Sequence, residues 1–195
     1  MEQKLLKDLC IDIFPGPAIF NNDALSNEDA GGYRVIRLAD IENGEISYDQ
    51  CHFYNNTSDF SKNRYILKKG DILLSSRGTI FKVAVVREDI EMMIPSGYLT
   101  CVRLSPKIEI SADYVASYIQ SLKPFEIAPD LNEQKHGVAF RIRAVDIFNI
   151  NIPIADAEVQ KKIEKLIRER LGSMKEIDKK KKEVKKIIST IKTAI

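Results

Sequence analysis

The chain has little of what usually identifies a protein class at first sight. It has no tryptophan, three cysteines, two histidines, 9 glycines and 7 prolines among 195 residues. With 44% hydrophobic and 30% charged residues, the composition is globular and excludes a disordered or low-complexity chain. Eight phenylalanines and seven tyrosines are therefore the large side chains available to fill a core.

The sequence also lacks signals for a membrane or an oxidising compartment. No apolar run approaches the roughly 20 residues of a membrane helix, and residues 1–10 are too charged for a signal peptide. Cys10, Cys51 and Cys101 are odd in number, far apart and outside any metal-ligand spacing. We therefore expect a cytoplasmic protein with free thiols, no membrane contact, no metal and no cofactor.

Catalytic signatures are missing as well. The chain has no Gly-rich phosphate loop, no Asn-Pro-Pro-Tyr motif and no Pro-Asp with Glu-x-Lys nuclease pattern. His52 and His136 stand apart from any candidate acid or nucleophile. The sequence therefore predicts a chain without catalytic residues.

Charge is distributed unevenly within the net charge of +2. Residues 1–154 hold 17 Lys and Arg against 21 Asp and Glu, whereas the rest of the chain holds 13 against 7. The body is thus acidic and the tail basic. Because nucleic-acid binding normally needs a basic surface, any such contact by the body must be concentrated on one face.

Short β-rich runs joined by turns dominate residues 33–104. The strand-like run 33–41 precedes Asn43-Gly44, the strongest hairpin-turn dipeptide. Further β-rich runs cover 72–74, 81–86 and 98–104. Together with short helices, these runs predict an α+β fold with a small twisted β-sheet or barrel-like unit.

The remaining body segments are less regular. Residues 1–32 are expected to be a short amphipathic start followed by a loop, and residues 128–137 a polar loop. Ser111 is a candidate N-cap for a helix over 112–122, which Pro124 should stop. Residues 145–154 are apolar, with Pro153 near the end.

The tail from residue 156 to 195 has one continuous helical pattern. Eight of the eleven a and d heptad positions are apolar. Such a helix is roughly 55–60 Å long, too long for one small domain to cover, so its apolar seam needs a partner. A helix folded back on its own domain is the alternative. The predicted partner-interface residues are Ile163, Ile167, Met174, Ile177, Val184, Ile188 and Ile191.

Charged residues accompany this seam. Arg170 and Lys181 occupy seam positions, where they weaken a simple homodimer or fix its register through charge pairing. Residues 179–182 are four consecutive lysines. We interpret them as a solvated helix face, and the alternative is a contact with phosphate or with an acidic partner.

The order of these elements resembles the specificity subunits of type I restriction–modification systems. The resemblance rests on the tyrosine-containing strand and hairpin of residues 33–46 and on Lys69-Gly-Asp-Ile-Leu73 with Arg77-Gly-Thr79. It also rests on residues 147–153, which would form a short apolar strand ending in Ile-Pro ahead of Gln160. It spans nearly the whole chain. The family's Ile-Pro-Leu-Pro followed by Glu-Gln is reduced here to Ile152-Pro-Ile154 and Val159-Gln160.

The resemblance implies a half-subunit. It would have one DNA target-recognition domain (1–154) and one coiled-coil helix (155–195), where the family usually has two of each. It would bind one half of a bipartite site in double-stranded DNA and recruit the methyltransferase subunit, with the restriction subunit left open. Methylation and cleavage would reside in those partners. Pairing with a second copy, or with a different half-subunit, would restore two recognition domains.

Two polar loops are the best candidates for DNA contact, because base and phosphate contacts need basic, amide or small hydroxyl side chains. The first loop contains Ser75, Ser76, Arg77, Gly78 and Thr79. The second contains Asn132, Gln134, Lys135 and His136, with Arg141 and Arg143 beyond it. Arg34, Arg37 and Lys82 are supporting candidates.

The acidic body leaves a rival function of a different class. The chain could be a non-catalytic interaction or regulatory protein of the same fold, even a DNA mimic. A concave face lined by Arg34, Arg77, Lys135 and Arg141 would favour recognition, and an acidic stripe there would favour mimicry. A fragment of a fused restriction–methylation enzyme is the least favoured hypothesis.

Overall fold

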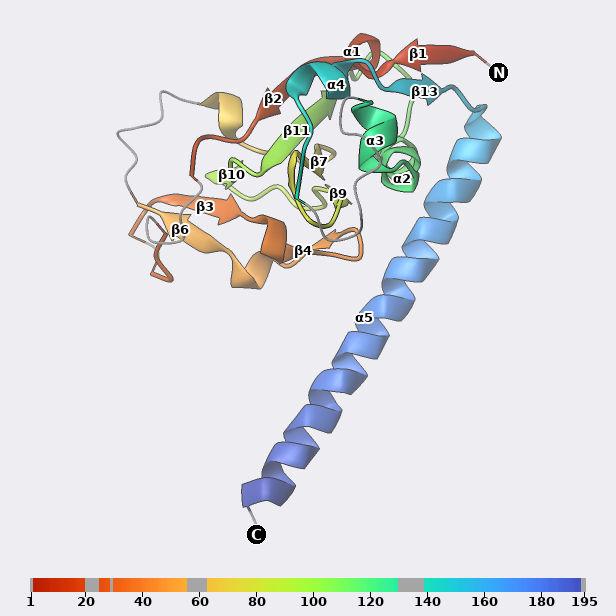
Figure 1. Ribbon diagram of the computed structural model, residues 1–195. Helices are drawn as coiled ribbons and strands as arrows, with labels where there is room; N and C mark the ends of the chain where they lie inside the picture. Colours follow the sequence, from red (N-terminus) through yellow and green to blue (C-terminus); the bar gives the residue numbers. More distant parts are fainter. Residues whose placement is uncertain (1, 20–24, 29, 56–62, 130–138, 194–195) are drawn as a thin grey trace. The chain divides into compact units, whose positions relative to one another are not determined.

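The computed structural model describes residues 2–19, 25–28, 30–55, 63–129 and 139–193 (Figure 1). The chain forms two compact units, Met1–Ala155 and Asp156–Ile195. We call the first the body and the second the helical unit, and describe each by itself. The body combines several small sheets with short helices, so the predicted α+β class is confirmed.

The largest sheet of the body has four antiparallel strands. Their order is β2 (Cys10–Pro15), β11 (Leu99–Leu104), β7 (Ile72–Ser75) and β9 (Val83–Val85). All residues of β7 are buried, which explains why its sequence is a continuous apolar run rather than an alternating one. Strand β2 lies within the segment that was expected to be an amphipathic start and a loop, so that expectation was wrong there.

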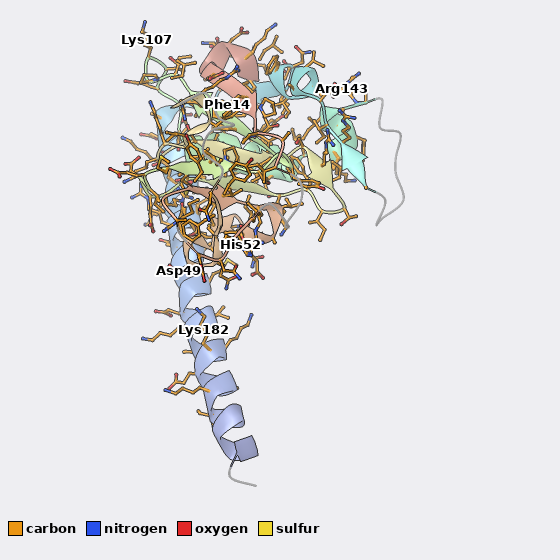
Figure 2. The ribbon with its side chains drawn as sticks, turned by 90° about the vertical axis from the view of Figure 1, so that its left-hand side faces the viewer. Phe14, Asp49, His52, Lys107, Arg143 and Lys182 are labelled. Carbon is orange, nitrogen blue, oxygen red and sulfur yellow. The ribbon has the colours of Figure 1, made fainter. Side chains whose placement is uncertain are left out.

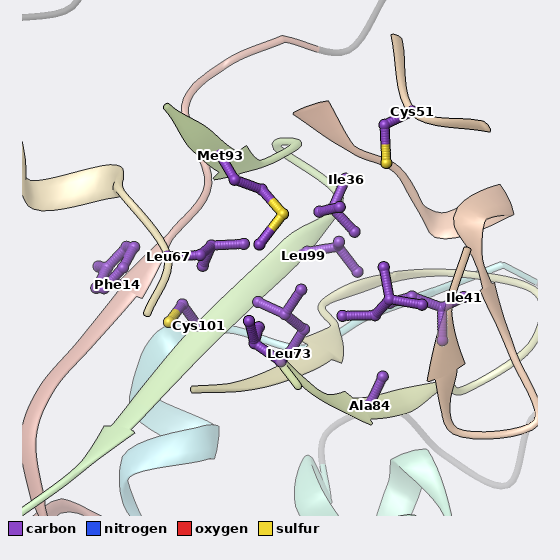
Figure 3. Close-up of a cluster of buried hydrophobic side chains, with 12 residues drawn as sticks. Phe14, Ile36, Ile41, Cys51, Leu67, Leu73, Ala84, Met93, Leu99 and Cys101 are labelled. Atoms are coloured by element: carbon purple, nitrogen blue, oxygen red, sulfur yellow. The ribbon is translucent and has the colours of Figure 1, made fainter. Parts of the chain in front are cut away.

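A second sheet has three strands in the order β10 (Met93–Pro95), β3 (Tyr33–Ile36) and β6 (His52–Tyr54). Strand β10 runs parallel to β3, whereas β6 runs antiparallel to it. The core is formed by a cluster of buried side chains, which Figure 3 shows. They include Phe14, Ile36, Leu73, Met93 and Leu99, which come from both sheets.

Three two-stranded ribbons also occur among the described residues of the body. Strands β4 (Ile41–Glu42) and β5 (Glu45–Ile46) form the predicted hairpin. Its turn residues Asn43 and Gly44 have φ values of 53° and 83°, as a type I′ turn requires. The other ribbons pair β8 (Arg77–Gly78) with β12 (Phe140–Arg141), and β1 (Gln3–Leu5) with β13 (Asn151–Pro153). The described part of the body also has the 3-10 helices η2 (Leu38–Asp40), η3 (Tyr48–Gln50) and η5 (Asn63–Tyr65).

The predicted N-cap of the longest body helix is confirmed. Helix α2 (Ala112–Ser121) begins after Ser111, whose hydroxyl accepts a hydrogen bond from Tyr114 N at 3.4 Å. Pro124 follows the end of α2 and also begins a further helix, α3 (Pro124–Ile127). A proline suits that first position because its missing N–H has no helical partner there. The body also contains α1 (Leu6–Leu9) and α4 (Ala144–Phe148).

Two local predictions need correction. The strand expected over 147–153 is confined to β13, because the preceding residues form α4. The polar loop expected over 75–79 contains a short ladder, since Arg77 and Gly78 pair with β12. Most of the polar loop expected over 128–137 lies outside the described residues.

The helical unit consists of α5 (Ala157–Thr193), 37 residues long. At 1.5 Å per residue its length is about 55 Å, so the predicted long helix is confirmed. Ion pairs one turn apart, Arg168–Glu164 and Lys165–Glu169, lie on its exposed surface. Within the described ranges, no helix is long and apolar enough to cross a membrane.

Candidate nucleic-acid interface

The β8–β12 ribbon brings two arginines together from distant parts of the sequence. Its register places Arg141 directly opposite Arg77, and Phe140 opposite Gly78. Side chains in such positions have Cβ atoms about 4.5–5.5 Å apart, and two like charges there are destabilising. Arg141 is exposed and Arg77 half-buried. A pair of cations held in this way favours a bound anion, such as a phosphate.

Backbone hydrogen bonds fasten this ribbon to the main sheet. Ile142 N donates to Ser76 O at 2.8 Å, and Ser76 N donates to Tyr98 O at 2.9 Å. The ring of Phe140 packs edge-on against Phe81, with centroids 6.0 Å apart. Gly78 has a φ of 145°, and a Cβ there would lie 3.0 Å from a Leu38 methyl. The glycine therefore permits both this backbone conformation and the close packing against Leu38.

Two predicted contact residues have partners inside the body. Ser75 is fully buried, and its hydroxyl accepts a hydrogen bond from Lys82 N at 2.8 Å. Lys82 Nζ donates to Leu38 O at 3.1 Å and to Ile41 O at 2.6 Å. These bonds hold the β4–β5 hairpin and η2 against the main sheet. Full burial contradicts the predicted DNA contact of Ser75, and the amine of Lys82, another predicted contact, is bound to two backbone carbonyls of the body.

Two similar five-residue segments form the same local structure at two places in the body. They are Arg37-Leu-Ala-Asp-Ile41 and Arg143-Ala-Val-Asp-Ile147. Each copy begins a short helix, η2 or α4. In both, the aspartate accepts a hydrogen bond from the arginine backbone N at 2.8 Å. The guanidinium also donates hydrogen bonds to both carboxylate oxygens, at 3.1 and 2.9 Å for Arg37 and at 2.9 and 2.7 Å for Arg143. We call each arrangement an Arg-Asp box.

The two boxes differ in their surroundings. The Arg37 side chain is 20% exposed, and it also approaches His52 Nε2 at 3.3 Å and Gln50 O at 3.4 Å. The Arg143 side chain is 57% exposed and follows β12 directly. Figure 2 shows Arg143 at an edge of the body well separated from His52. Arg143 thus extends the cationic ribbon, whereas Arg37 is engaged inside the fold.

The Arg143 box also affects titration. The hydrogen bond from Arg143 lowers the pKa of Asp146 below its usual value, although partial burial of the carboxyl opposes this shift. The carboxylate therefore stays ionised and keeps the guanidinium oriented at neutral pH.

Arg34 lies in a different place. Its guanidinium stacks over the Phe53 ring, 5.4 Å from the centroid, and lines a shallow hollow of about 410 Å³. Burial raises the pKa of the Cys51 thiol beside it to about 12, so that thiol is protonated and unreactive at neutral pH. The hollow is lined by Asn27, Arg34, Tyr48, Asp49, Gln50, Cys51 and Phe53.

The single concave face considered from the sequence is therefore only partly assembled. Arg77 and Arg141 meet, whereas Arg34 lines the separate hollow. The predicted loop residues Asn132, Gln134, Lys135 and His136 lie outside the described residues. Ser76 is buried, with its hydroxyl donating to Tyr98 O at 3.2 Å, and Thr79 is exposed.

Sequence reasoning missed two exposed side chains next to the ribbon, Ile80 and Tyr98. Ile80 closes the predicted loop 75–79, and Tyr98 provides the carbonyl that anchors Ser76. The proximity of Ile80 to Arg77 in sequence was the only available signal. Among the described residues, no group of three or more His, Cys, Asp or Glu could hold a metal ion.

The helical unit carries exposed apolar side chains. Of the predicted seam, Ile177 and Val184 are exposed, and Ile163, Ile167 and Met174 are half-buried. The side chains of Ile188 and Ile191 are outside the described set. Three further exposed residues widen the stripe beside the d positions: Val159, Leu166 and Ile187.

Comparison with known proteins agrees with this architecture. The family model described as "Type I restriction modification DNA specificity domain" matches residues 1–186. The specificity subunit of the type I restriction enzyme EcoBI from Escherichia coli is 24% identical over 148 residues, which cover 76% of this chain and 30% of that protein. The chain thus spans about a third of the length of this curated relative.

Solved structures share the fold. A chain from a study of assembly and conformational transition of the type I R-M system gives a TM-score of 0.59 at 17% identity, covering 90% of this chain and 40% of that one. The HsdS subunit from Thermoanaerobacter tengcongensis gives 0.56 at 18% identity, covering 90% and 39%. The S subunit from M. genitalium gives 0.55 at 16% identity, covering 92% and 42%. With nearly all of its length matched by the family model, the chain belongs to the type I restriction–modification DNA specificity domains.

Proposed function

We propose that this chain is the recognition half of a type I specificity subunit and works in the cytoplasm without catalysing a reaction itself. The body binds one part of a bipartite site in double-stranded DNA. The helical unit recruits the methyltransferase subunit, and through it the restriction subunit. The observation that carries this proposal is the pairing of Arg77 with Arg141 across the β8–β12 ribbon.

The chemistry of the ribbon suits DNA. A guanidinium offers a planar fork of donors that fits phosphate oxygens or the O6 and N7 edge of guanine. Arg143, held by its box, adds a third oriented guanidinium next to β12. Since the body as a whole is acidic, a local cationic cluster is also what distinguishes a DNA reader from a DNA mimic. This cluster supports recognition over mimicry.

The test is selection of a preferred sequence from a randomised duplex library by the full chain together with its methyltransferase subunit. Fluorescence anisotropy then measures affinity for the selected duplex. We expect Arg77→Ala and Arg141→Ala each to weaken binding about tenfold. Each should also reduce the salt slope, the steepness with which the logarithm of the binding constant falls with the logarithm of the salt concentration, by about 1.

Arg64→Ala is the matched control, because Arg64 is an exposed arginine of the body outside the ribbon, paired with Asp12 at 3.8 Å. Its binding should equal that of the wild type. The recognition proposal fails if the wild-type complex selects no sequence, or if the three variants bind alike.

For the helical unit we propose pairing with a second copy of the same chain through the apolar stripe. Two identical bodies would then read a palindromic site. The stripe is broad enough for more than a narrow two-helix seam, because Leu166 and Ile187 lie exposed beside the a and d positions. This breadth leaves apolar surface for the methyltransferase subunit as well.

Light scattering tests the pairing. We expect the chain to have the mass of a dimer, and Ile177→Asp to convert it to a monomer, because a buried unpaired charge disfavours the interface. Lys179→Asp, at an exposed position away from the seam, should leave the dimer intact. Arg170→Leu with Lys181→Leu should strengthen it. A wild-type monomer would refute self-pairing.

A further inference from the structure

Ile80 is more exposed than any other large hydrophobic side chain that the structure describes, at 63%. Single apolar residues on a surface are common and by themselves need no explanation. The position of Ile80 is what sets it apart, because it follows β8 and lies three residues after Arg77 in the sequence. An exposed apolar side chain thus lies three residues after one arginine of the ribbon, and the next residue, Phe81, packs on Phe140, the neighbour of the other arginine.

The segment that carries Ile80 is held firmly on both sides. Before it, Gly78 packs against Leu38 so closely that a Cβ would have only 3.0 Å. After it, Phe81 packs on Phe140, and Phe81 O accepts a hydrogen bond from Gln120 Nε2 at 3.4 Å. Ile80 is also β-branched, so its χ1 has few alternatives. The structure therefore presents this side chain in a defined place.

A ligand for this surface must offer an apolar group close to anionic groups. In the DNA major groove, the C5 methyl of thymine is such a group, with phosphates on both sides. That groove is about 12 Å wide and admits a two-stranded β-ribbon. The alternative is an apolar wedge between base steps, which must unstack the bases and accompanies strong DNA bending. Contacts from the paired arginines to phosphates do not require unstacked bases, so we favour the contact in the major groove.

We propose that Ile80 is a specificity-determining residue that contacts the C5 methyl of one thymine in the recognised half-site. This inference rests on the proposed function and deepens it. Thymine is then read by shape and apolar contact, while Arg77 and Arg141 fix the position of the ribbon on the duplex.

The experiment is a double-mutant cycle between protein and DNA. The full chain with its methyltransferase subunit is titrated with the selected duplex, and with duplexes in which each thymine in turn is replaced by deoxyuridine. At one position the wild type should bind about fourfold more weakly, because one buried methyl group contributes about 0.8 kcal/mol. With Ile80→Ala this loss should disappear, while losses elsewhere stay unchanged.

Ile11→Ala is the matched control, since Ile11 is 61% exposed and lies on β2. It should behave as the wild type toward every duplex. The inference is overturned if the wild type tolerates deoxyuridine everywhere, or if Ile80→Ala retains the same sensitive position. In those cases sequence-selective binding persists and only the reading role of Ile80 fails. Failure of the wild type to select any sequence would instead overturn the proposed function and this inference together.

Discussion

The two Arg-Asp boxes place one local motif in two different surroundings. Both close the start of a short helix with the same set of hydrogen bonds, at Arg37–Asp40 and at Arg143–Asp146. The Arg37 guanidinium is drawn into the fold by Asp40, Gln50 and His52. The Arg143 guanidinium remains mostly at the surface. The motif therefore determines the local geometry in both places, and its position in the fold determines how far the guanidinium is exposed.

The energetic consequence follows from solvent access. A pair shielded from water is costly to break, because removal of one partner leaves a buried charge uncompensated. An exposed pair is screened and contributes about 0–1 kcal/mol. The first box should therefore matter mainly for stability and the second mainly for ligand contact.

The largest expected effect is on stability. Asp40→Ala should lower the free energy of unfolding by about 3 kcal/mol, because Arg37 loses its counterion and its backbone N–H loses an acceptor. Asp146→Ala should cost only about 1 kcal/mol, since Arg143 can turn to solvent. Urea unfolding followed by circular dichroism measures both. Equal losses would show that the surroundings of the boxes do not matter.

The next expected effect is on DNA affinity. Arg143→Ala should weaken binding of the selected duplex about tenfold and lower the salt slope by about 1, because an oriented guanidinium is lost from the ribbon face. Arg37→Ala, measured at a temperature where the variant is folded, should bind nearly as the wild type does. Anisotropy titrations at several salt concentrations distinguish the two. If Arg37→Ala were the weaker binder, the assignment of roles would be reversed.

The sequence predicted the features that depend on interactions between residues close together in the chain. The Asn43-Gly44 turn, the Ser111 cap and helix α5 were predicted correctly because each depends on neighbouring residues. The pairing of β8 with β12 could not be predicted, because it joins residues about sixty positions apart. Only that pairing reveals Arg77 beside Arg141.

The burial of polar residues could not be predicted from the sequence either. Ser75 was predicted to contact DNA because its neighbours are polar, yet it continues β7 and is fully buried. The strand predicted over 147–153 failed because Arg143 and Asp146 favour a helix start, a local signal that the apolar run obscured. The Arg-x-x-Asp spacing is visible in the sequence at both places, so it could have been used.

The smallest expected effect is the pH dependence of the stability that the Arg143–Asp146 pair contributes. Arg143 lowers the pKa of Asp146 in the folded state, whereas the unfolded carboxyl titrates near its ordinary value of about 3.9. The resulting stabilisation is fully present above the unfolded pKa and is lost as the pH falls through the lowered folded pKa. Because Arg143 is more than half exposed, this contribution should stay below about 1 kcal/mol.

Urea unfolding of the wild type and Arg143→Ala between pH 6 and pH 3 measures this contribution. The stability difference between them should be largest at pH 6 and shrink as the solution becomes more acidic. Arg141→Ala, a neighbouring exposed arginine opposite Arg77 rather than Asp146, is the control and should show a pH-independent difference. A constant difference for Arg143→Ala would mean that the guanidinium does not hold the carboxylate in solution. Arg143 would then have no fixed orientation from which to meet DNA, and the comparison of the two boxes would rest on exposure alone.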